Sequence, residues 1–230
     1  MDSITGERTE MSKLDIVFFD MDYTVLENDC DVLWKNFLAD EKIAPESDRE
    51  RALYYLDLHH RGVLPVAEYT EFQWKEFAGK TPQQMEQLSQ RHFEEYVRPF
   101  IYPGAVKEIQ KYRQQNIPVV ILTGTNRVTA APIAAALDTD LIATDLEIVN
   151  GKFTGKLAGR FLIKENKVLM AEEYCRKRLD TSPDRAAFYG DSINDAILLD
   201  KVAQATVVNP KNNLLELAKE KNWRVVYWSL

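Results

Sequence analysis

Short apolar runs that end abruptly in polar or glycine residues are the feature that most constrains the fold of this chain. The first run, residues 14–19, stops at Asp20, and similar runs follow at 118–122, 186–189 and 203–208. They are rich in β-branched and aromatic residues and too short for helices, so they predict buried strands. Helical patterns separate or follow these strands at residues 105–115, 127–137, 167–179, 193–199 and 212–221. This alternation predicts an α/β fold whose parallel sheet is covered on both faces.

Two more segments extend the predicted sheet. Residues 145–149 and 152–157 flank Asn150-Gly151, which is a strong signal for a two-residue hairpin. Residues 224–228 predict a last strand at the edge.

Residues 30–98 contain no strand-like run and carry helix signals instead. Residues 47–50 and 81–84 both fit a capping box, and Gly62 and Gly79 fall where helices would end. Four helices are therefore expected, at residues 31–41, 48–61, 66–78 and 82–97. We predict an all-helical domain over residues 30–98, inserted between the first and second strands of a core made of residues 12–29 and 99–230.

Composition excludes several classes of function. With 29 basic and 36 acidic residues the formal charge is −7, which argues against nucleic acid and anionic membranes as partners. No apolar run approaches the roughly 18 residues that a membrane span needs. Residues 1–10 form a polar stretch with three acids, unlike a signal or transit peptide, and predict a loose tail. The spacing of Cys30 and Cys175 matches no metal-binding motif, and we expect both to be free thiols of a protein in the reducing cytoplasm.

Polar side chains follow three of the predicted strands, in the segments 20–22, 123–125 and 190–195. The carboxyl ends of parallel strands meet at one edge of the sheet, so four carboxylates are expected to converge there. Crowded anions repel one another unless a cation lies between them, and oxygen ligands alone favour Mg²⁺. Thr123 and nearby helix N-termini would suit a phosphate, and either Lys164 or Lys167 could complete the site.

The segments FFDMDYTVL, ILTGT, the Lys167 region and YGDSINDAILL resemble, in order and spacing, the motifs of the haloacid dehalogenase superfamily. RPFIYPGAV, NGKFTGKLAG and VVNPKNNLLELAKEKNWRVVYW resemble its phosphoserine phosphatase branch, subfamily IB. The resemblance implies a Rossmann-like core and identifies the helical insert with that branch's C1 cap. It also implies a phosphoric monoester hydrolase that forms an aspartyl-phosphate.

The resemblance assigns roles to individual residues. Asp20 would be the nucleophile, and Asp22 would act as general acid and then general base. Thr123, the amide of Gly124 and Asn194 would hold the phosphate. Lys167, which lies nearer the family spacing than Lys164, would neutralise charge. The implied Mg²⁺ ligands are Asp20, the backbone carbonyl of Asp22, Asp191 and Asp195.

The expected substrate is a small phosphomonoester, with phosphoserine first and histidinol phosphate or phosphoethanolamine as alternatives. Asp29 occupies the position of a substrate-binding glutamate in phosphoserine phosphatases, and Arg61 or Lys75 could bind a substrate carboxylate. Tyr23 departs from the small residue usual in the family. A phosphotransferase or mutase and a phospho-aspartate signalling receiver are the competing functions, and the protein is expected to be a monomer or homodimer.

The remaining features of the insert predict structural roles. Most of its aromatic side chains are expected to form a helix-bundle core. We expect the tripeptide His59-His60-Arg61 to form a solvated helix end and His92 to have a structural role.

Overall fold

The computed structural model describes residues 14–230, so the predicted tail and the predicted start of the core at residue 12 lie outside the described residues. The insert contains α1 (Cys30–Asp40), α2 (Ser47–His60), α3 (Val66–Trp74) and α4 (Pro82–His92). The strands are β1 (Ile16–Phe19), β2 (Val119–Asn126), β3 (Asp140–Val149), β4 (Lys152–Ala158), β5 (Ala186–Gly190), β6 (Gln204–Val208) and β7 (Arg224–Val226). The helices after the insert are α5 (Pro103–Gln114), α6 (Arg127–Leu137), α7 (Glu165–Tyr174), α8 (Ala196–Leu199) and α9 (Asn212–Glu220).

The described strands form one sheet in the order β4-β3-β2-β1-β5-β6-β7. Every neighbouring pair is parallel except β3 and β4. Strand β1 lies between β2 and β5. The sheet extends from β2 through β3 and β4 on one side of β1, and from β5 through β6 and β7 on the other. The predicted α/β class is confirmed, and β1 marks the point where ligands bind in such sheets.

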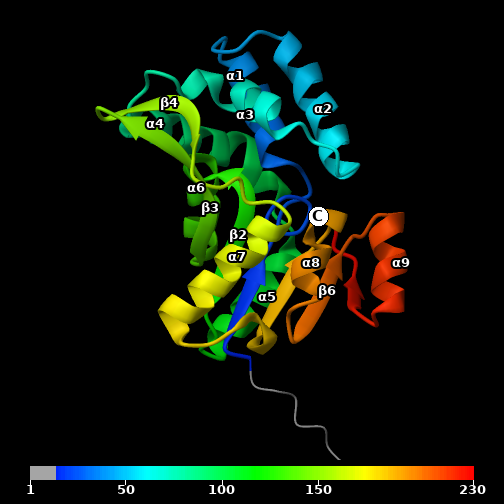
Figure 1. Cartoon of the computed structure of the whole chain (residues 1–230). Helices are drawn as coiled ribbons and strands as arrows, with labels where there is room; N and C mark the ends of the chain where they lie inside the picture. Colours follow the sequence, from blue (N-terminus) through cyan, green and yellow to red (C-terminus); the bar gives the residue numbers. More distant parts are fainter. Residues whose placement is uncertain (1–13) are drawn as a thin grey trace, which may run out of the picture.

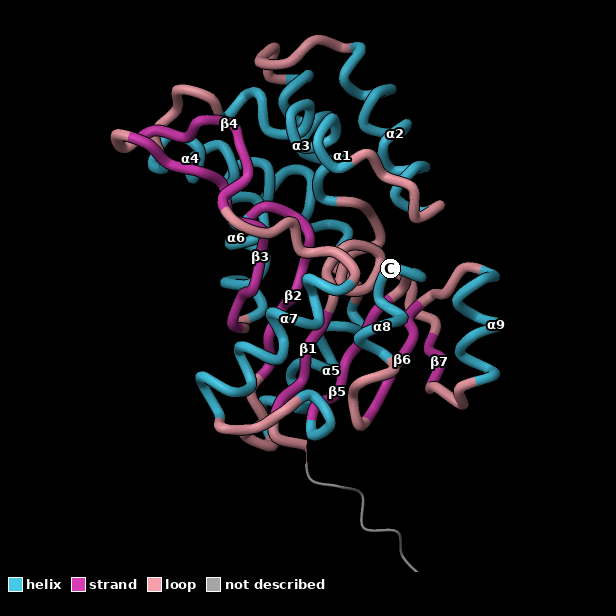
Figure 2. The backbone as a smooth tube through the Cα atoms, viewed as in Figure 1, coloured by secondary structure: helices cyan, strands magenta, loops and turns pink. Residues whose placement is uncertain are grey.

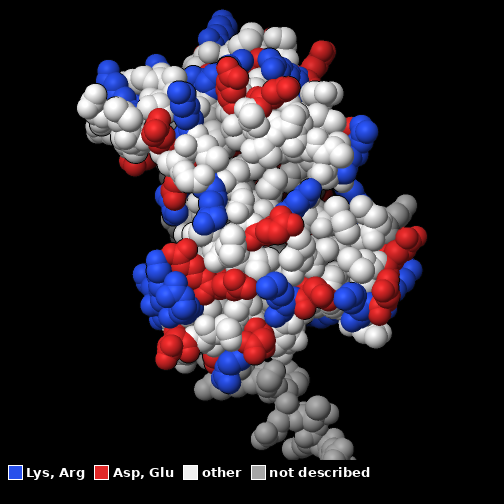
Figure 3. Space-filling model, in the orientation of Figure 1, with Lys and Arg blue, Asp and Glu red and all other residues white. Residues whose placement is uncertain are grey.

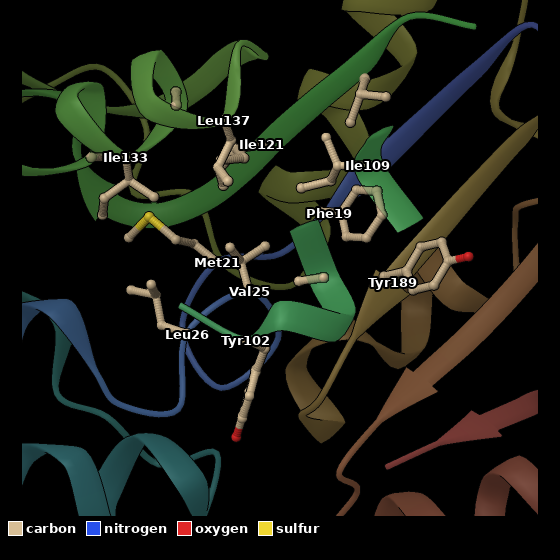
Figure 4. Packing of buried hydrophobic residues seen from close by; sticks show 14 of the residues in the cluster. Phe19, Met21, Val25, Leu26, Tyr102, Ile109, Ile121, Ile133, Leu137 and Tyr189 are labelled. Carbon is tan, nitrogen blue, oxygen red and sulfur yellow. The ribbon is translucent and has the colours of Figure 1, made fainter. Parts of the chain in front are cut away.

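Alternation along β1 builds the two faces of the core. Val17 and Phe19 pack into one apolar cluster with residues of α5 and α6, such as Ile109 and Ile133. Ile16 and Phe18 pack into the other cluster, with residues of α7, α8 and α9. Figure 4 shows the first cluster, where Met21, Val25 and Leu26 extend the packing beyond the end of β1. The loop that follows β1 is therefore anchored by apolar side chains.

The helical insert stands above the carboxyl end of the sheet (Figure 1). Trp34, Phe37, Trp74 and Phe77 of the insert are buried in one apolar cluster, as the aromatic content predicted, and Leu146 and Phe153 of β3 and β4 belong to the same cluster. The capping box at residues 81–84 is confirmed, because Thr81 and Gln84 exchange their hydrogen bonds. The box at residues 47–50 is wrong: α2 already begins at Ser47, after a helical Glu46 without a capping bond. The division into domains at residues 30 and 98 stays a prediction.

The β3–β4 hairpin links the sheet to the insert. Strand β3 begins at Asp140, earlier than predicted, and its first residues pair with β2. Its second half pairs with β4 and reaches the insert helices (Figure 2). Gly79 N donates a 2.8 Å hydrogen bond to Phe153 O, and Phe153 N donates one of 2.9 Å to Lys80 O. The rings of Phe77 and Phe153 also pack at 5.5 Å between centroids, so the hairpin and the insert are joined by backbone as well as side-chain contacts.

The surface agrees with a chain of mixed charge. On the face in Figure 3, acidic and basic side chains lie interspersed over both the insert and the sheet-bearing part. Within residues 14–230, no helix has the length and apolar character needed to cross a bilayer.

Candidate active site

Strands β1, β2 and β5 deliver the predicted polar residues to one edge of the sheet. Asp20 follows β1 directly, Thr123 and Gly124 lie within β2, and Asp191 follows β5. A pocket between this edge and the insert is lined by Asp20, Asp22, Gly124, Lys167, Asp191 and Asn194, among others. Thr123 is fully buried and is not among the lining residues; its Oγ1 accepts a 3.1 Å hydrogen bond from Thr125 N.

Lys167 is the electrostatic centre of the site. Its Nζ donates hydrogen bonds of 2.7 Å to Asp20 Oδ1 and to Asp195 Oδ1, and all three side chains are buried. Burial alone would lower the pKa of Lys167, but the charges of Asp195 and Asp20 raise it above its ordinary value. Lys164 instead donates to Gly62 O at 3.0 Å. Of the two lysines that the sequence allowed, Lys167 lies in the centre.

Three carboxylates next to Lys167 form a group that fits a metal ion. One oxygen each from Asp20, Asp191 and Asp195 lies within 4.8 Å of the others, and the three residues are buried. Burial and the charges of Asp20 and Asp195 hold the pKa of Asp191 well above its usual range. A small, hard dication would relieve this repulsion, and an all-oxygen donor set suits Mg²⁺. The side chain of Asp22 is not part of this group.

The carboxyl of Asp22 is held by two hydrogen bonds. Thr125 Oγ1 and Cys30 N each donate to it at 2.7 Å. Burial, together with the charges of Asp29 and Asp20, raises its pKa well above the usual value, whereas the pKa of Asp20 rises only to about 6. Asp20 is therefore the more readily ionised of the two groups, and Asp22 the one that more readily keeps a proton. Thr125 positions that acid, a contact that the sequence interpretation missed.

The end of α2 meets the sheet-bearing part at Asn194. Asn194 Nδ2 lies 3.2 Å from His59 O and 3.3 Å from His59 Nε2, while its buried Oδ1 has no partner in the described chain. His60 Nδ1 lies 2.9 Å from Lys211 Nζ. The prediction of a solvated helix end is therefore wrong for both histidines, which line the pocket, and holds only for Arg61.

His59 and Tyr23, which both line the pocket, depart from the ordinary behaviour of their residue types. Burial and the neighbouring Lys167 lower the pKa of His59 to about 4, so it is neutral at physiological pH. Tyr23, the departure from the family pattern, adopts a φ of +57° and packs against the His60 ring at 5.5 Å between centroids. The bulky residue thus takes a backbone conformation that L residues rarely adopt.

Asp29 and Asp31 line the pocket at the start of α1. Asp29 caps the helix by accepting a 2.8 Å hydrogen bond from Val32 N. Burial, reinforced by each group's neighbouring acids, raises the pKa of both carboxyls to about 7. Neither Arg61 nor Lys75 lines the pocket; Arg61 pairs with Asp57 at 3.3 Å and Lys75 with Asp48 at 2.7 Å. The expected partner for a substrate carboxylate is thus not found in these two residues.

Comparison with known proteins gives the site a family context. A family model for haloacid dehalogenase-like hydrolases matches residues 17–200. A histidinol-phosphatase of Neisseria meningitidis is 27% identical over 217 residues, covering 92% of this chain and 97% of that protein. A phosphoserine phosphatase of Mycobacterium tuberculosis is 30% identical over 149 residues, covering 64% of this chain and 48% of that protein. This chain thus aligns with only about half of the mycobacterial protein.

Solved structures share the fold along most of the chain. A Bordetella pertussis protein of unknown function superimposes with a TM-score of 0.84 at 28% identity, covering 93% of this chain and 98% of that one. A substrate-bound phosphoserine phosphatase superimposes with a TM-score of 0.67 at 20% identity, covering 93% of both chains.

Proposed function

The chain belongs to the haloacid dehalogenase-like hydrolases, and from this premise we propose that it is a Mg²⁺-dependent phosphatase that cleaves a small phosphomonoester through an aspartyl-phosphate. The observation that carries the proposal is the Lys167 bridge. The buried ammonium of Lys167 lies 2.7 Å from both Asp20 and Asp195, beside a third carboxylate, and so holds a positive charge next to the proposed nucleophile. Phosphatase relatives support the same reaction class.

In the first step, an Asp20 carboxylate oxygen attacks phosphorus while the ester P–O bond breaks. The proton of Asp22 passes to the leaving alcohol oxygen, which is the acid role that its raised pKa favours. In the second step, water attacks phosphorus and gives a proton to Asp22. The bond between Asp20 and phosphorus then breaks, and inorganic phosphate leaves. Both carboxyls return to their starting protonation states.

The residues around Asp20 would lower the barrier by holding charge in place. Lys167 would neutralise negative charge shared by Asp20 and the phosphoryl oxygens. Thr123, the Gly124 amide and Asn194 remain the proposed phosphate-binding groups. The buried Oδ1 of Asn194 has no partner among the described residues, and its Nδ2 donates to His59 O. Asp20, Asp191, Asp195 and the Asp22 carbonyl are the proposed Mg²⁺ ligands; the ion would offset the acidic cluster and polarise the phosphoryl group.

The proposal is tested by phosphate release from a panel of small phosphomonoesters with and without Mg²⁺. We expect activity that EDTA abolishes and that Asp20→Asn lacks. Asp200→Asn is the matched control, because Asp200 is an exposed acid paired with Lys221 outside the pocket.

The intermediate is tested by a rapid acid quench with ³²P-labelled substrate. Label should remain on wild-type protein and be absent from Asp20→Asn. Turnover without EDTA sensitivity would contradict the metal requirement, and label retained by Asp20→Asn would contradict the nucleophile.

A further inference from the structure

One carboxylate oxygen in the pocket lacks a hydrogen-bond donor. Asp31 is only 7% exposed, and its Oδ2 accepts a 2.5 Å hydrogen bond from the Tyr69 hydroxyl. Its backbone carbonyl accepts a 3.2 Å bond from Gln73 Nε2, so this region is held by α3. Asp31 Oδ1 has no partner among the described residues, although Asp31 lines the pocket. A buried acceptor left without a donor is costly, which points to a donor supplied by a ligand.

No nearby cation of the protein fills this role. Lys35 lies one turn further along α1, but its Nζ binds Phe72 O at 2.8 Å and Glu76 Oε2 at 2.7 Å. Lys167 is the only Lys or Arg among the described residues that line the pocket, and it is engaged by Asp20 and Asp195. No Lys or Arg side chain of the described residues therefore donates a hydrogen bond to Asp31 Oδ1.

The charge around Asp31 also restricts the substrate. Asp29 lines the pocket two residues away, so a carboxylate on the leaving group would face two acids and find no basic partner there. A cationic nitrogen would instead find two acceptors. The rings of Tyr55, Tyr69 and Phe161 also line the pocket and suit a cation or an aromatic ring.

We propose that Asp31 determines specificity by accepting a hydrogen bond from a cationic nitrogen of the leaving group, and that this leaving group is an amino alcohol without a carboxylate. The inference rests on the proposed phosphatase function and narrows its substrate class. Histidinol phosphate and phosphoethanolamine meet this description, whereas phosphoserine does not.

The test compares kcat/KM for histidinol phosphate, phosphoethanolamine, O-phosphoserine and the amine-free propyl phosphate. We expect the wild type to prefer at least one amino alcohol phosphate over both phosphoserine and propyl phosphate. Asp31→Asn keeps an acceptor for Tyr69 but removes the ionisable carboxyl, and should reduce the preference for amine over propyl by about 10- to 100-fold. Glu68→Gln is the matched control, since Glu68 is an exposed acid beside Tyr69 that does not line the pocket.

Binding of free histidinol, measured by calorimetry, separates this inference from the reaction itself. We expect wild type and Glu68→Gln to bind it and Asp31→Asn to lose most of the affinity. A wild-type preference for phosphoserine, or an equal loss on all four esters in Asp31→Asn, would overturn the inference while the phosphatase function stands. Failure of all four esters with histidinol still bound would overturn the proposed function alone. If Asp31→Asn does not fold, the wild-type order of the four esters decides.

Discussion

His92 should make the stability of this protein depend on pH in a way that one substitution removes. The imidazole is fully buried against aromatic rings, with Trp34 at 5.1 Å and Phe37 at 5.7 Å between centroids. Both ring nitrogens lack partners in the described chain. Burial lowers the pKa of His92 from 6.5 to about 3, so the folded protein keeps this ring neutral at pH 5.

The sign and size of the effect follow from proton linkage. Below pH 6.5 the unfolded chain binds a proton at His92 that the folded chain refuses, so the free energy of unfolding falls as pH falls toward 3. At pH 5 the loss is RT ln(1 + 10^1.5), or about 2 kcal/mol; at pH 7.5 it is under about 0.1 kcal/mol. His92→Leu removes the titrating group, and it also removes polar atoms that have no partner.

Urea unfolding of wild type and His92→Leu at pH 7.5 and pH 5.0, without Mg²⁺, measures this effect. The variant should gain about 2 kcal/mol relative to wild type between the two pH values. Other titrating groups occur in both proteins and cancel in this double difference. The same stability difference at both pH values would refute the reasoning, because His92 would then titrate alike in the folded and unfolded chains.

Three further predictions concern the close packing at Gly190, the ion bound by the acidic group, and the two buried thiols. Gly190→Ala should destabilise the fold by about 1–3 kcal/mol and reduce activity, because its Cβ would lie 2.9 Å from Asp195 Cβ; unchanged thermal melting would contradict this. Mg²⁺ should raise the melting temperature of wild type more than that of Asp191→Asn; equal shifts would mean that the ion binds elsewhere. Cys30 and Cys175 are fully buried free thiols, and burial raises the pKa of Cys175 to about 11. Both should resist a thiol reagent until urea unfolds the protein, so rapid labelling of native protein would contradict their burial.

Most of the sheet could be predicted from the sequence, because the central strands leave a local pattern in it. Each central strand is a short apolar run with a polar end, and parallel pairing then brings Asp20 and Asp191 to one edge. Strand β3 was predicted only in its hairpin half, since the apolar run at residues 141–143 is only three residues long and lies between Asp140 and Thr144. The proposed catalytic roles and domain limits stay predictions.

Contacts across the pocket could not be predicted in the same way. His59 and Asn194 are 135 residues apart, and two histidines before an arginine carry no local sign that the insert folds over the sheet edge. The orphan oxygen of Asp31 depends on where Tyr69 and Lys35 direct their own donors. Such features arise from tertiary packing, and periodicity along the chain does not record them.

Strand β3 pairs with β2 of the sheet in its first half, and the hairpin formed by its second half and β4 binds the insert. This arrangement limits how the insert can move relative to the sheet. The chain passes between the sheet-bearing part and the insert twice, and these two connecting segments are hydrogen-bonded to each other. Glu27 N donates to Phe100 O at 2.8 Å, and Tyr102 N donates to Val25 O at 2.9 Å. The hairpin adds a second attachment at Gly79 and Lys80. Two separated attachments oppose rotation of the insert as one rigid body.

The end of α2 is held differently, since its contacts with the sheet-bearing part at His59, His60 and Gly62 all involve side chains. This helix end is therefore expected to be displaced more easily than the insert as a whole. A local motion of this kind breaks fewer packing contacts than rotation of the whole insert. Asp20, Asp191 and Asp195 lie at the sheet edge and outside α2, so they would keep their geometry from one turnover to the next.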